Sequence, residues 1–394
     1  MGIISAIGDT VEENFRSLAE LKPGISRIEN LDTVHKDVIW VGEIKKTNQD
    51  LAKYLNLEEG NNFTRTAMLG VMAARQAVEN AGITDIGEWK TGLVSATSVG
   101  GMDTTERYFR EYLEEEPVRK YILSHDPGDS THKIADALGI HGGFITTIST
   151  ACSSAANAIM LGARLILSGE LDRVVVGGTD ALAKFTINGF KTLMILSDSP
   201  NTPFDGDRKG LNLGEAAAYL VLESEEAIKA GNKKILAWLS GFGNANDAYH
   251  QTASSENGEG ATLAMEKALR VAGLAPGDID YINVHGTATG NNDLSEGRAL
   301  INIFGDRVPD FSSTKPYTGH TLAAAGAIEA VYSILSLQHG MIWPNLNFRN
   351  PMPEFDLVPV TRLQKKEIRH VLSNSFGFGG NCSTLLFTAA DDLY

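Results

Sequence analysis

Residues 144–152 read FITTISTAC and join a β-branched apolar run to an alanine-rich segment, residues 153–168, that has helical spacing and ends before Gly169. We predict a strand over 144–149 and a helix over 153–168, which places Cys152 at a helix N-terminus. Free backbone N–H groups and the positive end of the helix dipole favour a thiolate there. Most lone cysteines are small buried hydrophobic residues instead. The position alone therefore leaves both interpretations open.

The same strand and helix pattern occurs twice along the chain. Four segments form two matching pairs in the same order: AVENAGI (77–83) with ALRVAGL (268–274), and ANAI (156–159) with AGAI (325–328). A predicted strand follows the first pair in each half, at 91–98 and at 279–284. We interpret this as a duplication, in which Cys152 and His320 precede equivalent helices and can converge on one pocket between the halves.

Length and composition allow two α/β halves. The chain has 394 residues, of which 43% are hydrophobic, and this is enough for a large core. We expect an N-terminal half at residues 1–226, which carries Cys152 and a cap insertion near 100–131. A C-terminal half at residues 227–394 would carry His285 and His320, the two histidines that we consider as catalytic candidates below.

Charge and cysteine content exclude several classes of protein. The formal net charge of −15 argues against nucleic acid or an anionic membrane as a partner. The chain shows neither a signal peptide nor an apolar run long enough to span a membrane. Two cysteines are too few for a disulfide framework, so we expect a reducing cytoplasm.

Three further motifs belong with the cysteine. NVHGTAT at 283–289 places His285 directly after a strand, where α/β folds present side chains to ligands. STKPYTGH at 313–320 supplies His320 and Lys315, and NSFGFGGN at 374–381 is a glycine-rich turn whose backbone can approach a reacting group closely. Together, and in this order, the motifs are highly specific.

With these motifs, nearly the whole chain resembles the elongating β-ketoacyl-[acyl carrier protein] synthases of the thiolase superfamily, which include polyketide ketosynthases. The resemblance extends from the first residues through PFDGDR at 203–208 to the final GFGG. It implies a thiolase-like α/β fold, with two pseudo-symmetric halves that form a layered α-β-α-β-α core.

The resemblance also implies a role for each motif residue. Cys152 is the acyl-accepting nucleophile, and His285 and His320 support decarboxylation of malonyl-thioester. Lys315 is the active-site lysine, and its acidic partners match Asp293 and Glu296. The remaining implied positions are the oxyanion-hole amides of Cys152 and Phe378, the supporting Glu329, and a monovalent cation site at Asn283, Glu329, Ser373 and Asn374.

The expected reaction is a decarboxylative Claisen condensation that elongates an acyl chain on Cys152 with malonyl-acyl carrier protein, as in fatty acid synthesis. Attack by the thiolate creates an oxyanion, which two backbone N–H groups can hold. Loss of CO₂ leaves an enolate, to which two neutral imidazoles can donate. We expect no redox cofactor and no catalytic metal. The expected partners are the acyl carrier protein and a second subunit, in a homodimer or a heterodimer.

Some positions depart from the family pattern. Glu58 and Glu59 stand where relatives usually carry a basic pair. Either docking of an acidic carrier depends on other residues, such as Arg65, Arg208 and Lys209, or the partner is a less usual carrier, or this loop has no docking role. Gly290 replaces a common proline after HGTAT. The first strand looks clipped at its start, so we expect a few native residues to precede Met1.

Three alternative functions stay open at this point. A ketosynthase of a specialised polyketide or polyene pathway would use the same residues. A thiolase would need a second catalytic cysteine, and Cys382 is near the right place but reads as strand core. A non-catalytic chain-length subunit would characteristically lack the nucleophile, whereas Cys152 is present.

Overall fold

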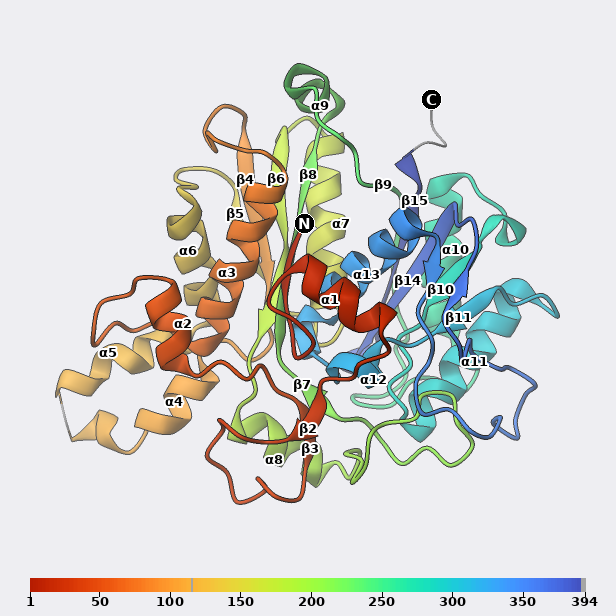
Figure 1. Ribbon diagram of the computed structural model, residues 1–394, viewed down its shortest axis with the longest axis horizontal. Helices are drawn as coiled ribbons and strands as arrows, with labels where there is room; N and C mark the ends of the chain where they lie inside the picture. The colour runs from red at the N-terminus through yellow and green to blue at the C-terminus, as the bar shows by residue number, and fades with distance from the viewer. Residues whose placement is uncertain (115, 391–394) are drawn as a thin grey trace.

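The computed structural model describes residues 1–114 and 116–390, and two five-stranded sheets form its framework (Figure 1). The first sheet has the order β1 (Gly2–Ile4), β8 (Ala216–Glu223), β6 (Arg173–Asp180), β4 (Thr91–Ala96) and β5 (Ile145–Ile148). The second has the order β9 (Trp238–Asn246), β15 (Asn381–Thr388), β14 (His370–Gly377), β10 (Tyr281–Asn283) and β11 (Asp310–Ser312).

The two sheets have the same pattern of strand directions. In the first sheet, β5, β4 and β6 are parallel, β8 pairs antiparallel with β6, and β1 pairs antiparallel with β8. In the second sheet, β11, β10 and β14 are parallel, β15 pairs antiparallel with β14, and β9 pairs antiparallel with β15. This correspondence confirms that the fold consists of two pseudo-symmetric α/β halves.

Six helices complete five layers. In the first half, α3 (Arg65–Asn80) and α6 (Pro127–Leu138) cover the outer face of the sheet, as α10 (Glu259–Ala272) and α11 (Gly290–Phe304) do in the second half. Helices α7 (Ser154–Leu167) and α13 (Ala325–His339) lie between the two sheets (Figure 1). The order of layers is therefore α-β-α-β-α, as predicted.

The sequence of α13 explains its place in the middle layer. Residues 325–337 of this helix are all buried, so no face of it is polar and solvated. A helix that is hydrophobic all round must be buried on every side. Because α13 and α7 begin beside His320 and Cys152, the buried central layer brings both side chains to the interface between the halves.

The remaining elements surround this framework. A small sheet contains β2 (Ile25–Arg27), β3 (Trp40–Gly42) and β7 (Leu213–Gly214). The cap insertion contains α4 (Met102–Tyr108), η1 (Glu111–Leu113), η2 (Glu116–Val118), α5 (Arg119–Ile122) and η3 (Leu123–His125). The other elements are α1 (Val11–Ala19), α2 (Asn48–Tyr54), α8 (Lys184–Thr192), α9 (Glu225–Gly231), η4 (Pro276–Asp278), α12 (Lys315–Thr318), η5 (Leu322–Ala324), β12 (Met341–Ile342), β13 (Gln364–Lys365) and η6 (Phe378–Gly380).

The predicted boundary between the halves, after residue 226, falls inside α9, just before β9. The division into residues 1–226 and 227–394 stays a prediction, and positions 115 and 391–394 of it lie outside the described residues. Among the described helices, none has the length and apolar character needed to cross a membrane.

Candidate active site

Cys152 lies in a tight turn between β5 and α7. The residue before it, Ala151, has a φ of 52°, in the left-handed region that residues with a Cβ rarely adopt. The end of β14 presses against this turn, because a Cβ on Gly377 would lie 2.7 Å from the Thr150 carbonyl oxygen and 3.2 Å from the Cys152 nitrogen. Contact from the other half of the molecule therefore holds the strained turn in place.

The environment of the Cys152 thiol differs from the expectation. Burial raises its pKa to about 12, although the charge of Lys315 and the Phe378 backbone N–H, which faces the sulfur, both lower it. The predicted preference for thiolate is therefore wrong for the resting protein, because removal from solvent outweighs the helix N-terminus. The position of the Phe378 N–H supports its expected place in an oxyanion hole.

His285 and His320 meet beside the cysteine. Their ring centroids are 5.2 Å apart with the rings nearly perpendicular. The Lys315 ammonium lies 3.3 Å from Nδ1 of His285, and the Leu322 backbone N–H donates to Nδ1 of His320 at 3.2 Å. Because an ammonium and an amide can only donate, both Nδ1 atoms accept, and each neutral ring carries its proton on Nε2.

Burial, followed by the charge of Lys315, lowers the pKa of both imidazoles well below 6.5. Both rings are therefore neutral at neutral pH. The arrangement supports the expectation of two Nε2–H donors that point toward one substrate.

Lys315 has a different acidic partner from the one expected. Its ammonium pairs with Glu329 on α13 and donates to the His285 carbonyl oxygen. The prediction that Asp293 and Glu296 hold this lysine is therefore wrong. The reason is packing, since α13 brings Glu329 against α12, and burial raises the pKa of that carboxyl to about 7 despite the cation.

Asp293 and Glu296 instead organise the backbone around the histidine loop. Glu296 accepts hydrogen bonds from the N–H groups of His285 and Gly286, both at 2.8 Å. Asp293 accepts from Phe204 N–H at 2.7 Å and from Ala288 N–H at 3.1 Å. Both carboxylates are fully buried, and their hydrogen bonds fix the backbone of the loop that carries His285 on the side away from solvent.

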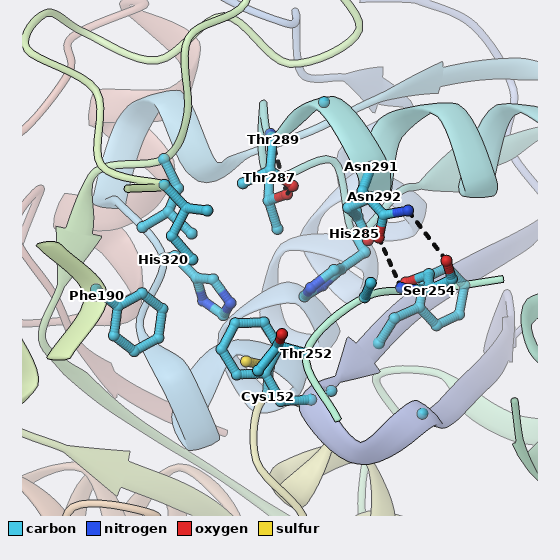
Figure 2. Close-up of a pocket in the computed structure, with 18 residues that line it drawn as sticks. Cys152, Phe190, Thr252, Ser254, His285, Thr287, Thr289, Asn291, Asn292 and His320 are labelled. Atoms are coloured by element: carbon cyan, nitrogen blue, oxygen red, sulfur yellow. Dashed lines mark hydrogen bonds between the residues drawn. The ribbon is translucent and has the colours of Figure 1, made fainter. Parts of the chain in front are cut away.

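A cavity of about 250 Å³ unites these groups (Figure 2). Its catalytic candidates are Cys152, His285, His320 and the Phe378 loop. Sequence reasoning missed the other walls, which are formed by Phe190, Ile195, Leu211, Thr252, Ala253, Ser254, Thr287, Thr289, Asn291, Asn292 and Phe376. Thr287 and Thr289 have a local signal in the HGTAT motif, but Phe190 comes from α8 and lies against Phe378 only through tertiary packing, with ring centroids 5.7 Å apart.

Two buried oxygens near Glu329 fit the expected monovalent cation. Asn283 Oδ1 and Ser373 Oγ have no hydrogen-bond partner among the described residues, and the two residues face each other across β10 and β14. The side chain of Asn374 is already engaged, because it donates to Glu296 at 3.1 Å and accepts from Thr384 at 2.8 Å. Asn283 and Ser373 are thus the members of the predicted set with free ligand capacity.

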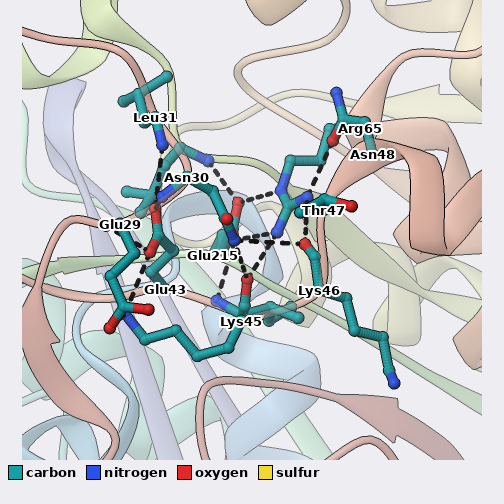
Figure 3. A network of polar contacts seen from close by, with 12 residues as sticks. Glu29, Asn30, Leu31, Glu43, Lys45, Lys46, Thr47, Asn48, Arg65 and Glu215 are labelled. Atoms are coloured by element: carbon teal, nitrogen blue, oxygen red, sulfur yellow. Dashed lines mark hydrogen bonds and ion pairs between the residues drawn. The ribbon is translucent and has the colours of Figure 1, made fainter.

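The basic residues expected to dock a carrier are mostly engaged inside the protein. Arg65 is buried and forms an ion pair with Glu215 at 2.6 Å, within the polar network shown in Figure 3. Arg208 is mostly buried and donates to the Gly290 carbonyl oxygen at 2.9 Å. The proposal of Arg65 as a docking residue is therefore wrong, and of the three basic residues Lys209 alone is exposed.

Two other predicted features have clear structural outcomes. Cys382 is buried on β15, between Phe376 and Ala245 on the neighbouring strands, and burial raises its pKa. Its interpretation as strand core is confirmed.

Gly290 is the first residue of α11, and a Cβ there would meet no described atom within 4 Å, so packing does not require glycine.

Comparison with known families agrees with this site. Residues 1–227 match the N-terminal domain of the beta-ketoacyl synthases, and residues 236–349 match the C-terminal domain. The chain belongs to the β-ketoacyl synthase family. The predicted family, and with it the class of condensing acyltransferases, is confirmed.

Individual relatives span almost the whole chain. A 3-oxoacyl-[acyl-carrier-protein] synthase 2 from Staphylococcus aureus is 34% identical over 402 residues, covering 98% of this chain and 99% of that protein. The ishigamide ketosynthase/chain length factor has a TM-score of 0.91 at 30% identity, with 98% and 97% of the chains covered. A type II polyketide ketosynthase in complex with its acyl-carrier protein has a TM-score of 0.88 at 26% identity, with 99% and 98% covered.

Proposed function

We propose that this β-ketoacyl synthase condenses an acyl group on Cys152 with malonyl-acyl carrier protein, releasing CO₂ and forming 3-ketoacyl-acyl carrier protein in fatty acid elongation. The observation that carries the proposal is the convergence of one thiol and two Nε2–H imidazoles in a single buried cavity. A thiol alone would allow acyl transfer. The two donors beside it are suited to a reaction that creates an enolate.

The first step is acyl transfer to the enzyme. The Cys152 sulfur attacks the thioester carbonyl of the acyl-carrier, and the oxyanion receives the backbone N–H groups of Cys152 and Phe378. The carrier thiol leaves with the proton that the cysteine lost. Since the resting thiol is protonated, bound substrate or a neighbouring imidazole must assist this proton transfer.

The second step forms the new carbon–carbon bond. Malonyl-thioester loses CO₂, and the Nε2–H groups of His285 and His320 donate to the resulting enolate oxygen. The enolate carbon attacks the acyl-enzyme carbonyl and expels the Cys152 thiolate, which takes up one proton. Lys315 acts indirectly here, because its contact with Nδ1 of His285 keeps the proton of that ring on Nε2.

One assay tests the activity and its substrate range. Purified protein is incubated with malonyl-carrier and with acyl-carriers of graded chain length, and the products are resolved by mass spectrometry. We expect release of CO₂ and products two carbons longer than the acyl donor. Decarboxylation with no chain extension for any donor would contradict the proposal.

A specialised polyketide or polyene pathway is the second candidate, because a ketosynthase/chain length factor and a polyketide ketosynthase are among the similar structures. Repeated extension of one acyl chain in the same assay would favour it over fatty acid elongation.

We further propose that the protein acts as a dimer, as a homodimer or with a non-identical subunit. The edge strand β5 supports this, since it is partly exposed beside Phe144, whose exposed fraction is 40%. Native mass spectrometry of the purified chain tests the homodimer. A monomer that dimerises only with a second protein would favour the heterodimer. The cytoplasmic location also stays a prediction.

The proposed monovalent cation would be held by Asn283 and Ser373, near Glu329 and Asn374. It would supply positive charge that stabilises the buried loops behind the histidines. We expect the melting temperature to depend on the monovalent cation in the buffer, and this dependence to be lost in Ser373→Ala.

A further inference from the structure

A buried carboxylate of the first half reaches the turn that carries His320 in the second half. Asp180 is the last residue of β6 and is fully buried. Its Oδ2 accepts a hydrogen bond from the Ala323 backbone N–H at 2.9 Å. Ala323 lies in η5, which begins two residues after His320.

The other partners of Asp180 anchor the carboxylate firmly in its own half. Oδ1 accepts from Thr97 Oγ1 at 2.5 Å and from the N–H groups of Ser98 and Val99, both at 3.0 Å. Oδ2 also accepts from Ser98 Oγ at 2.7 Å. Every partner is a donor, which suits an ionised carboxylate and fixes where its second oxygen points.

The turn after His320 needs such an anchor because its backbone is strained. Leu322 has a φ of 53°, in the left-handed region, which costs conformational energy for a residue with a Cβ. Its N–H is the group that donates to Nδ1 of His320. The backbone of His320, where the turn begins, is held by β7 and the residue before it. The His320 N–H donates to the Asn212 carbonyl oxygen at 2.7 Å, and the His320 carbonyl oxygen accepts from the Gly214 N–H at 2.9 Å.

The pseudo-symmetry of the fold gives this contact a counterpart. β6 and β14 are equivalent strands, and each ends against the helix start of the opposite half. Gly377 at the end of β14 lies against the Cys152 turn, while Asp180 at the end of β6 holds the His320 turn. In each half, the end of the equivalent strand thus contacts the turn that carries the candidate catalytic side chain of the other half.

We infer that Asp180 is a positioning residue that, through Ala323 and Leu322, fixes the orientation and the Nε2–H form of the His320 imidazole. The inference rests on the proposed function for its effect on catalysis. The effect on the imidazole itself is independent of any activity.

Asp180→Asn is the sharpest test. Oδ1 receives three donors, so the asparagine oxygen should take that place and its amide group should face the Ala323 N–H, which breaks that contact. Of the other donors to Oδ2, the Ser98 N–H keeps its bond to Oδ1, and the Ser98 hydroxyl can accept from the amide instead. Ser98→Ala is the matched control, because it also removes a donor from Oδ2 but keeps the Ala323 contact. If Asp180→Asn does not fold, Asp180→Ser removes the acceptor without an opposing amide.

Two measurements are made on each variant. Long-range ¹H–¹⁵N NMR of protein labelled with ¹⁵N-histidine reports the tautomer of His320, whose signal is identified by its loss in His320→Ala. Decarboxylation of malonyl-carrier is then compared with acyl transfer to Cys152, measured by intact mass.

In Asp180→Asn we expect mixed tautomers of His320, and decarboxylation lowered on the order of 10²-fold, the scale for a misplaced catalytic group, with a smaller loss of acyl transfer. Ser98→Ala should resemble the wild type in both. An unchanged His320 signal in a folded Asp180→Asn or Asp180→Ser variant would overturn the inference. Normal decarboxylation by His320→Ala would instead contradict the proposed function, and the NMR comparison would still decide the role of Asp180.

Discussion

Cys152 and Cys382 are both buried thiols, and their surroundings decide which of them can react. Cys152 lines a cavity with two imidazoles and faces the Phe378 N–H, whereas Cys382 lies between two paired strands. Burial raises the pKa of both. Reactivity at Cys152 therefore depends on groups that stabilise the reacting carbonyl more than on a thiolate already present in the resting protein.

Cys152→Ser should abolish acyl transfer and condensation together, because a hydroxyl near its ordinary pKa is a poor nucleophile without a dedicated base. Intact mass after incubation with acyl-carrier measures this. Cys382→Ser is the control, and its Cys152 should be acylated to the same extent as in the wild type. Acylation that persists in Cys152→Ser and disappears in Cys382→Ser would contradict the assignment.

The histidine pair leads to a prediction for pH dependence. The pKa of each ring lies well below 6.5 in the folded protein, so both keep the neutral Nε2–H form as pH falls from 8 through 6.5. Protonation of these two rings should therefore cause no loss of decarboxylation across this range. Folding stability should decrease below pH 6.5, because unfolded histidines then bind protons that the folded protein excludes. NMR of protein labelled with ¹⁵N-histidine measures the protonation of each ring, and a ring that takes up a proton near pH 6.5 in the folded protein would contradict the neutral pair.

Lys315→Ala should destabilise the protein by ~3–5 kcal/mol, because it leaves Glu329 buried without its cation. The pKa of Glu329, already raised to about 7, should rise further, so the variant should lose stability as pH increases from 6 to 8. Denaturant unfolding at both pH values measures this. The control, Arg16→Ala, breaks the exposed ion pair with Glu12 on α1 and should cost less than ~1 kcal/mol. Equal melting of both variants would contradict a buried pair.

At the scale of elements, the rim of the pocket depends on contacts between loops. Asn291 at the start of α11 accepts from Ser254 N–H at 2.6 Å and donates to the Ser254 carbonyl oxygen at 3.0 Å (Figure 2). The same loop meets the Phe378 turn, where Gly379 N–H donates to the Gln251 carbonyl oxygen at 2.8 Å. Residues 247–256 thus connect α11 to the Phe378 turn.

Asn291→Ala should loosen this loop, since it removes two hydrogen bonds that together hold Ser254. Hydrogen exchange should become faster in peptides that cover residues 250–256, while the strands of both sheets keep their protection. Asn302→Ala is the control, because it removes bonds from the same helix farther along, to Asn257 and Thr262. Unchanged exchange at 250–256 would show that contacts with the Phe378 turn hold the loop without Asn291.

For the molecule as a whole, the net charge of −15 is unfavourable for an acidic carrier. Glu58 and Glu59 are exposed on the loop before α3, and the nearby basic side chain of Lys120 donates to the Gly60 carbonyl oxygen at 2.5 Å. Acidic and basic groups therefore meet on this part of the surface.

Glu58→Lys with Glu59→Lys should raise the association rate with an acidic carrier, and the gain should shrink as salt increases, because rim charges act through steering that is screened beyond about 8 Å at physiological ionic strength. Turnover at saturating carrier should stay nearly unchanged. The control reverses Glu225 and Glu226 on α9, which are also exposed, with Glu225 in an ion pair with Lys229. If both double variants raise the association rate equally, the effect comes from net charge alone. If the Glu58 and Glu59 variant shows no gain that depends on salt, these two residues lie away from the docking face.

Local patterns were enough to predict the two halves, the turn at Cys152 and the histidine motifs. Strand and helix periodicity depends on neighbours along the chain, and the duplicated segments implied that Cys152 and His320 precede equivalent helices. The resemblance to ketosynthases added the roles of Phe378 and Lys315, which no spacing indicates.

Contacts across the molecule decided the rest. Asp293, Glu296 and Glu329 all lie in the same region of the sequence as Lys315, and only the tertiary structure, which places Glu329 of α13 beside the lysine, selects Glu329 as its partner. Burial raises the pKa of Cys152, and the end of β14 at Gly377, which packs against its turn, lies more than two hundred positions away. The burial of Arg65 likewise depends on Glu215, far along the chain in the same half, and the contact of Asp180 with Ala323 arises where the two halves meet. Periodicity records which face of an element is apolar, whereas the partner of a buried charge depends on which elements the fold brings into contact, and these can come from any distance along the chain.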